Sequence, residues 1–190
     1  MAVAFPTRRH SSRVEDFNVT PVVFLQNNPQ YDCVAVGALV MFGVTPNTRA
    51  LISKRDTAVA LPGKWEVPSG PCDDPNLTIL ATLNRILLEE THLQIEFIAD
   101  LAGVETFDIQ TGKRVRKFTF IVQAQDGIPA TLQKYQAWDL VSLDEAFQAQ
   151  SVNFGLLTFT SASQREIILN GFSKYDEILS FRSWCRGGTI

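Results

Sequence analysis

The chain has 190 residues, with 45% hydrophobic and 19% charged side chains, which is typical of one globular domain with a single core. A formal net charge of −3 argues against a general binder of nucleic acids or anionic membranes. The three cysteines have no metal-type spacing and do not suggest a disulfide framework, so a reducing, cytoplasmic setting is favoured. The chain has no run of about 18 apolar residues, so no membrane-spanning helix is expected.

We interpret residues 1–20 as a flexible lead-in and residues 21–190 as one domain. The apolar start is too short for a secretory signal, although its Arg and Ser content leaves an organellar transit peptide open. Thr20–Gln26 is a short apolar run that fits either a strand or one turn of helix. Cys33–Val44 and Arg49–Asp56 together predict a hairpin, with the first strand covered on both faces.

A loop rich in proline and glycine, at residues 60–76, precedes the clearest helical pattern. That pattern predicts a helix from Asn76 to Thr91, with Asp74 as its N-cap and Pro75 at the first helical position. Its buried stripe consists of the apolar residues at helical spacing, namely Ile79, Leu80, Leu83 and Leu87.

The second half of the chain predicts three further strands and two helices. The strands are expected at 93–107, 115–125 and 137–143. Ser142 is expected to cap a short helix, and a longer closing helix is expected over 160–181, with Gly171 as a candidate interruption. This order of elements implies a mixed sheet with helices packed on it.

Two adjacent acids, Glu89 and Glu90, stand near the end of the predicted central helix. Surface acids on a helix are common, but carboxylates at a helix C-terminus cost up to about 1 kcal/mol each. Arg85, four residues before Glu89, offsets part of that cost. Residues 86, 89 and 90 share one helix face, where three acids would form an oxygen site for Mg²⁺ or Mn²⁺. Ile86 fills the third position with hydrocarbon.

The segment from Gly63 to Leu93 resembles the signature motif of the Nudix hydrolases. The matching residues are Trp65, Pro68, Gly70, Arg85, Leu87, Glu89, Glu90 and Leu93. The likeness covers roughly residues 33–172 and implies the Nudix fold, an α/β (α+β) mixed sheet sandwiched between helices, with a small-molecule substrate. It also allows a homodimer, because Nudix-like proteins are often dimers.

Three positions depart from the motif. Ile86 replaces an acid that, by the resemblance, supplies a carboxylate to divalent metals, and a hydrocarbon cannot coordinate Mg²⁺. Leu77 replaces an acid that braces the loop, a loss that packing can repair. His92 replaces the closing glycine and is expected to form either a rebuilt helix cap or a catalytic imidazole. The segment Thr131–Trp138, where the family often has another acid, contains none.

Three functions fit these residues. The first is a divergent enzyme that performs carboxylate acid-base chemistry on a small metabolite, as in an isomerisation, a cyclisation or a hydration, with no cofactor required. The hydrocarbon of Ile86 makes this face drier, which is expected to raise the pKa of a neighbouring carboxyl and to suit it to proton transfer. The second is a weakened Mg²⁺-dependent pyrophosphohydrolase of nucleoside diphosphate-linked compounds, and the third is a non-catalytic ligand-binding module. The predicted site consists of Glu89, Glu90 and His92 as catalytic residues, Trp65, Glu66, Arg85 and Glu105 as substrate-binding residues, and Glu89 and Glu90 as ligands if a metal is retained.

Overall fold

Strand β2 (Cys33–Phe42) lies at the centre of the sheet because nearly all of its side chains are apolar and can be covered on both faces. It pairs in parallel with β7 (Arg114–Ala124) and antiparallel with both β3 (Arg49–Arg55) and β5 (Ser69–Pro71). The computed structural model describes residues 9–125, 127 and 135–187. Within them the strands follow the order β1-β6-β7-β2-β3-β4, with β5 on β2 and β8 on β3.

The remaining elements complete this sheet and cover it. The strands are β1 (Arg9–His10), β4 (Trp65–Glu66), β6 (Ile95–Asp108) and β8 (Tyr135–Val141), with a separate pair formed by β9 (Gln150–Ser151) and β10 (Gly155–Leu156). The helices are the 3₁₀ helix η1 (Ser12–Phe17), α1 (Pro21–Asn27), α2 (Ile79–Thr91), α3 (Leu143–Gln148) and α4 (Ala162–Gly187).

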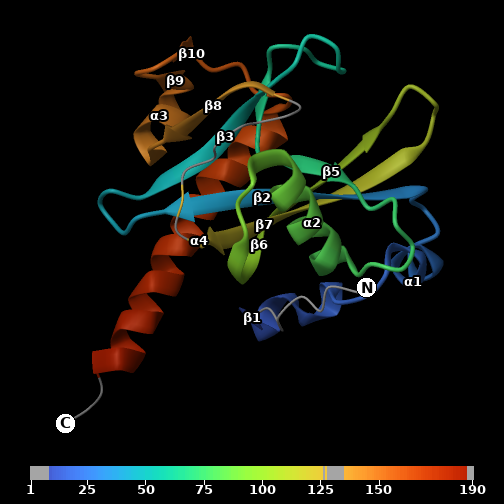
Figure 1. The fold of residues 1–190 in the computed structure, drawn as a ribbon, viewed down its shortest axis with the longest axis horizontal. Helices are drawn as coiled ribbons and strands as arrows, with labels where there is room; N and C mark the ends of the chain where they lie inside the picture. Colours follow the sequence, from blue (N-terminus) through green and yellow to red (C-terminus); the bar gives the residue numbers. More distant parts are fainter. Residues whose placement is uncertain (1–8, 126, 128–134, 188–190) are drawn as a thin grey trace.

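Alternate residues of β2 enter two separate cores. Val34 and Val36 pack with α2 and η1 on one face of the sheet, whereas Leu39 and Met41 pack with α4 on the other. Figure 1 shows α2 in front of the sheet and α4 crossing behind it. This mixed sheet between helices confirms the predicted α/β (α+β) class. Among the described residues, no helix is long and apolar enough to cross a bilayer.

The N-terminal segment differs from the expected flexible lead-in. Arg9–His10 pairs in parallel with β6, and Val14 of η1 is fully buried in the core beside α2. Residues 1–8 lie outside the described part of the chain. The run at 20–26 forms a helix rather than a strand, because Thr20 accepts a hydrogen bond from the Val23 amide and Pro21 occupies the first turn.

The predicted start of the central helix is wrong. Helix α2 begins at Ile79, and its N-cap is Thr78, whose hydroxyl accepts a hydrogen bond from the Ala81 amide at 3.1 Å. Asp74 instead accepts from the Asn76 amide at 2.9 Å, so its carboxylate closes a turn before the helix. The loop expected at residues 60–76 also contains β4 and β5.

Helix α4 runs through Gly171 without the interruption that the sequence left open. A Cβ atom at residue 171 would lie 2.0 Å from Cδ2 of Leu39. Glycine is therefore required for the close approach of α4 to β2 rather than for a break in the helix.

Candidate functional site

Glu90 is held inside the molecule, where the last turn of α2 faces the beginning of β5 and β8. It is 2% exposed, and its Oε2 accepts hydrogen bonds from the Tyr135 hydroxyl at 2.9 Å and from the Ser69 amide at 3.2 Å. Hydrogen bonds to an ionised acceptor are stronger than those between neutral groups. The carboxylate is thus fixed by donors from two strands.

Glu66, on β4, lies on the other side of Ser69. The Ser69 hydroxyl donates to Glu66 Oε2 at 3.4 Å, while its amide donates to Glu90. Arg55 donates to the other Glu66 oxygen, and Lys117 Nζ lies 3.8 Å from Oε2. Ser69 therefore joins two buried carboxylates, one of which already has two cationic partners.

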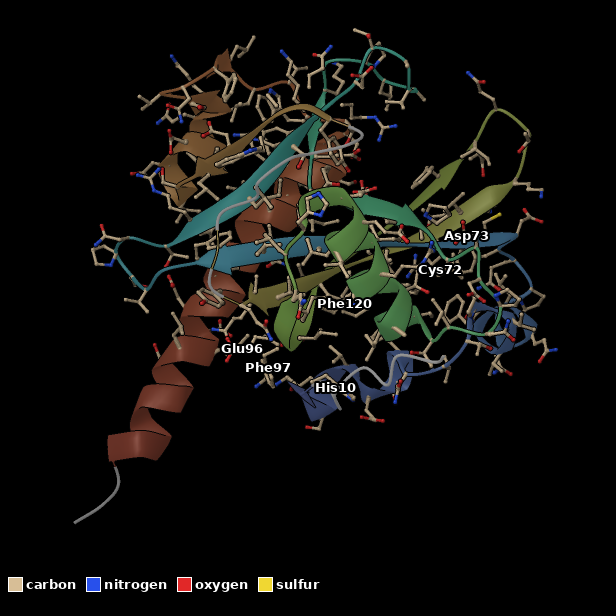
Figure 2. All side chains as sticks on the ribbon, viewed as in Figure 1. His10, Cys72, Asp73, Glu96, Phe97 and Phe120 are labelled. Carbon is tan, nitrogen blue, oxygen red and sulfur yellow. The ribbon has the colours of Figure 1, made fainter. Side chains whose placement is uncertain are left out.

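Arg85 and Glu89 lie on the outer side of α2. The Arg85 guanidinium donates to the Asp73 carboxylate and lies 3.6 Å from Glu89, whose side chain is 52% exposed. Asp73 stands in the segment that leads from β5 towards α2, where Figure 2 labels it. The two acids that the sequence places side by side therefore meet different surroundings, Glu90 inside the protein and Glu89 in solvent beside a cation.

Ile86 points into the core beside α2 and is 4% exposed. A Cβ atom at residue 70 would lie 3.0 Å from Cδ1 of Ile86, so the glycine at position 70 makes room for this side chain. The position that would complete an acidic face is therefore filled by hydrocarbon packed against the backbone of β5.

His92 ends α2 in the left-handed conformation, with φ of 59°. Its amide donates to the Leu88 carbonyl at 3.0 Å, and its side chain is exposed. His92 thus forms the helix cap, which was one of its two predicted roles. The other role, that of a catalytic imidazole, stays a prediction.

Trp65 is buried in the core beside α4, with its ring 5.1 Å from that of Phe154. Its role in substrate binding also stays a prediction.

Two buried groups near this site have altered proton affinities. Burial raises the pKa of the Tyr135 hydroxyl well above its ordinary value, and the negative charges of Glu90 and Glu66 raise it further. Burial also raises the pKa of the Cys72 thiol to about 12. Both groups therefore keep their protons at neutral pH.

A model of the NUDIX domain family matches residues 33–162. The chain belongs to the Nudix family. Comparison with curated protein sequences gives no significant match.

Solved structures of Nudix proteins share the fold of this chain. A MutT protein from Methanosarcina mazei Go1 is 20% identical, with 75% of this chain and 94% of that chain covered and a TM-score of 0.57. An Ap4A hydrolase from C. elegans is 15% identical (76% and 97% covered, TM-score 0.58). The NUDIX domain of Shewanella oneidensis NrtR, complexed with ADP ribose, is 16% identical (83% and 99% covered, TM-score 0.56). At these identities the likeness shows the fold alone.

The divalent cation that the Nudix family implies does not fit the residues that the structure describes. Ile86 offers no oxygen, Glu89 is beside Arg85, and both oxygens of Glu66 face cations. Within the same described residues, no group of three or more His, Cys, Asp or Glu side chains is placed to hold a metal. Residues 131–134, part of the segment Thr131–Trp138 that contains no acid before Trp138, lie outside the described residues.

Sequence reasoning missed the partners of the two buried glutamates, namely Arg55, Ser69, Lys117 and Tyr135. Only Lys117 gave a signal, because a lysine within the apolar run of β7 is unusual for a strand covered on both faces. Glu105, predicted to bind substrate, lies 3.7 Å from Lys117 and accepts a hydrogen bond from Ser161 at 2.7 Å.

Proposed function

We propose that this Nudix chain is a divergent enzyme that moves a proton on a small metabolite, in an isomerisation, a cyclisation or a hydration, and that its metal-dependent diphosphate hydrolysis is impaired. The surroundings of Glu90 support this proposal most strongly, because a buried carboxylate is held there by the Tyr135 hydroxyl and the Ser69 amide. A fixed carboxylate shielded from water is suited to general acid-base catalysis.

In this mechanism the Glu90 carboxylate accepts a proton from one atom of the substrate and returns it to another. Such a transfer needs no oxidant, reductant or metal. The raised pKa of Tyr135 keeps its hydroxyl protonated, so it remains a donor that orients Glu90. Tyr135 is less buried than Glu90, so we place the substrate beside Tyr135. Glu89 and His92, both exposed at the same end of α2, stay candidates for direct contact with it.

Deuterium exchange tests the proposal without knowledge of the product. Small metabolites are incubated with the protein in D₂O and followed by proton NMR. The native protein is expected to exchange a carbon-bound proton of at least one compound, and Glu90→Gln is expected to abolish this exchange. Glu96→Gln is the matched control, because Glu96 is an exposed glutamate on β6. Exchange that persists in Glu90→Gln would contradict the proposed role.

A weakened Mg²⁺-dependent pyrophosphohydrolase is the second candidate. It is favoured by the two acids that the motif retains, Glu89 and Glu90, and by an Ap4A hydrolase among the structures with the same fold. It predicts phosphate release from nucleoside diphosphate-linked compounds that requires Mg²⁺ and is lost in Glu90→Gln.

A non-catalytic ligand-binding module is the third candidate. It is favoured by the NUDIX domain of NrtR, which was solved with ADP ribose and shares the fold. It predicts saturable binding of a small molecule, detected by calorimetry, with neither proton exchange nor phosphate release.

A further inference from the structure

The segment from α3 to β10 leaves large apolar side chains open to solvent. Of the twelve such side chains that are exposed among the described residues, five lie within residues 143–156. Val152 is 90% exposed and Leu156 is 77% exposed, although removing apolar surface from water is favourable. We call the five residues the apolar patch. They are Leu143, Phe147, Val152, Phe154 and Leu156.

The apolar patch is formed by elements that lie together. Leu143 and Phe147 are four residues apart in α3 and therefore share one face of that helix. Leu156 of β10 is the cross-strand partner of Gln150 in β9, so these two exposed side chains lie on the same face of the strand pair. Figure 1 shows α3, β9 and β10 grouped at one corner of the molecule, beside β8.

The backbone beneath the apolar patch is fixed before any partner binds. The Ser151 hydroxyl accepts hydrogen bonds from the amides of Asn153 at 3.1 Å and Phe154 at 3.3 Å. The same hydroxyl donates to the Asp139 carboxylate. The Phe154 ring lies 5.1 Å from the buried ring of Trp65, in an edge-to-face arrangement. A surface that is already ordered loses little conformational entropy on association.

The larger part of the apolar patch lies in an uncharged stretch. The sequence from Ala146 to Gln164 contains no charged residue, although 19% of the chain is charged. Charged side chains stand at the border of the patch instead. Arg49 and Glu145 form an ion pair at 2.6 Å, and the Arg165 guanidinium lies 6.0 Å from the centre of the Phe147 ring. An apolar centre with a polar border is typical of protein–protein interfaces.

The size and the charge of the apolar patch fit a second copy of this chain. The five side chains leave on the order of 600 Å² of apolar surface exposed, which is the upper end for the largest patch on a monomer. Two such patches facing each other would bury about 1,200 Å², the lower limit for a stable specific interface. Because the patch is uncharged, an identical patch meets it without like-charge repulsion, and charge does not favour a different partner.

We propose that the apolar patch is the interface of a homodimer, in which two copies of the chain are related by a twofold axis and each buries the patch of the other. The proposal goes beyond the proposed function, because the dimer requires neither a substrate nor turnover.

Sedimentation velocity of the full chain, from low to high micromolar concentration, tests the proposal. The native protein is expected to reach a mass of twice 21.2 kDa at the upper concentrations. Leu156→Lys and Val152→Lys are each expected to raise the Kd of dimerisation at least about tenfold, because an ammonium group would lose its water in an apolar interface. Both positions are exposed, so each variant is expected to keep the native Tm.

Val44→Lys is the matched control, because Val44 is an exposed valine in the turn between β2 and β3, outside the apolar patch. It is expected to dimerise as the native protein does. Amide hydrogen exchange locates the interface. Amides within residues 147–157 are expected to exchange more slowly at high than at low protein concentration in the native protein, but not in Leu156→Lys.

The proposal is overturned if the native protein sediments as a monomer at every concentration, because the patch is then left open or is covered by a different protein. It is equally overturned if Leu156→Lys and Val152→Lys both dimerise as the native protein does, because the dimer then uses another surface. A failure of the substrate deuteration experiment would count against the proposed function alone, since sedimentation involves no substrate.

Discussion

At the scale of single residues, the contact between Tyr135 and Glu90 is expected to make the free energy of unfolding fall at alkaline pH. The pKa of Tyr135 is raised in the folded state, so its contribution to the free energy of unfolding is complete below about pH 10, the ordinary tyrosine pKa, and is lost as the pH rises above it. Native stability is expected to fall above pH 10 more steeply than that of Tyr135→Phe. At pH 8 the variant is expected to be less stable by about 1–3 kcal/mol, because a donor to a carboxylate is lost.

Denaturant unfolding of both proteins at pH 8 and in steps above pH 10 measures this difference. Parallel stability curves for native protein and Tyr135→Phe would show that the tyrosine is not coupled to the buried acids.

Cys72 is expected to be unreactive in the folded protein because its pKa of about 12 leaves almost no thiolate at pH 8. Titration with a chromogenic disulfide reagent at pH 8 is expected to give the same number of reactive thiols for native protein and Cys72→Ser. In denaturant the native protein is expected to show one thiol more than the variant. If folded Cys72→Ser shows one reactive thiol fewer than the folded native protein, the expected low reactivity of Cys72 is wrong.

The sequence predicted the site at this scale only in part. It singled out Glu90 and Ile86, because a helical repeat places them on one face. It could not predict that Glu90 is buried while Glu89 is exposed, because this depends on Tyr135, which lies 45 residues away in the sequence. For the same reason the pairing of Lys117 with Glu66 required the folded sheet.

At the scale of elements, the start of α2 offers a direct comparison of two caps. Thr78→Ala is expected to lower the free energy of unfolding by about 1 kcal/mol, because the Ala81 amide loses its acceptor. Asp74→Ala, at the residue that the sequence favoured as the cap, is expected to cost less, because it removes only a turn contact. Chemical denaturation of the two variants measures both effects, and a larger loss for Asp74→Ala would place the helix start earlier.

The packing of α4 on β2 predicts the effect of a single methyl group. Gly171→Ala is expected to destabilise the protein by about 1–3 kcal/mol, because its Cβ would overlap Leu39, which is fully buried. This loss outweighs the gain of about 1 kcal/mol in helix propensity. Ser173→Ala, at an exposed position of α4, is the control and is expected to change stability little. Equal or higher stability of Gly171→Ala, measured by thermal unfolding, would contradict the close approach.

Elements with a clear local pattern were predictable from the sequence, among them β2 from its continuous apolar run, β3, and the capped helix α3. The short strands β4 and β5 were not, because the Pro and Gly that surround them predict a loop. The buried position of η1 was not predictable either, since it depends on tertiary contacts with α2 and the sheet.

At the scale of the whole molecule, the chain has the Nudix architecture, and Ile86 stands on the helix face that carries Glu90. The family model covers residues 33–162, and the solved structures share the fold at 15–20% identity. Fold alone does not determine chemistry. The features on which the proposed chemistry rests are local: Ile86 is buried where the resemblance implies an acid, and Lys117 and Arg55 face the Glu66 carboxylate.

The most direct measurement is phosphate release from a panel of diphosphate compounds, with and without Mg²⁺. The native protein is expected to release no more phosphate than Glu90→Gln, because no oxygen ligand stands at position 86. Ile86→Glu, whose fold is checked by cooperative thermal unfolding, is expected to gain Mg²⁺-dependent release, and Ile86→Gln is its uncharged control. Strong Mg²⁺-dependent release by the native protein that disappears in Glu90→Gln would contradict the account and return this chain to metal-dependent hydrolysis.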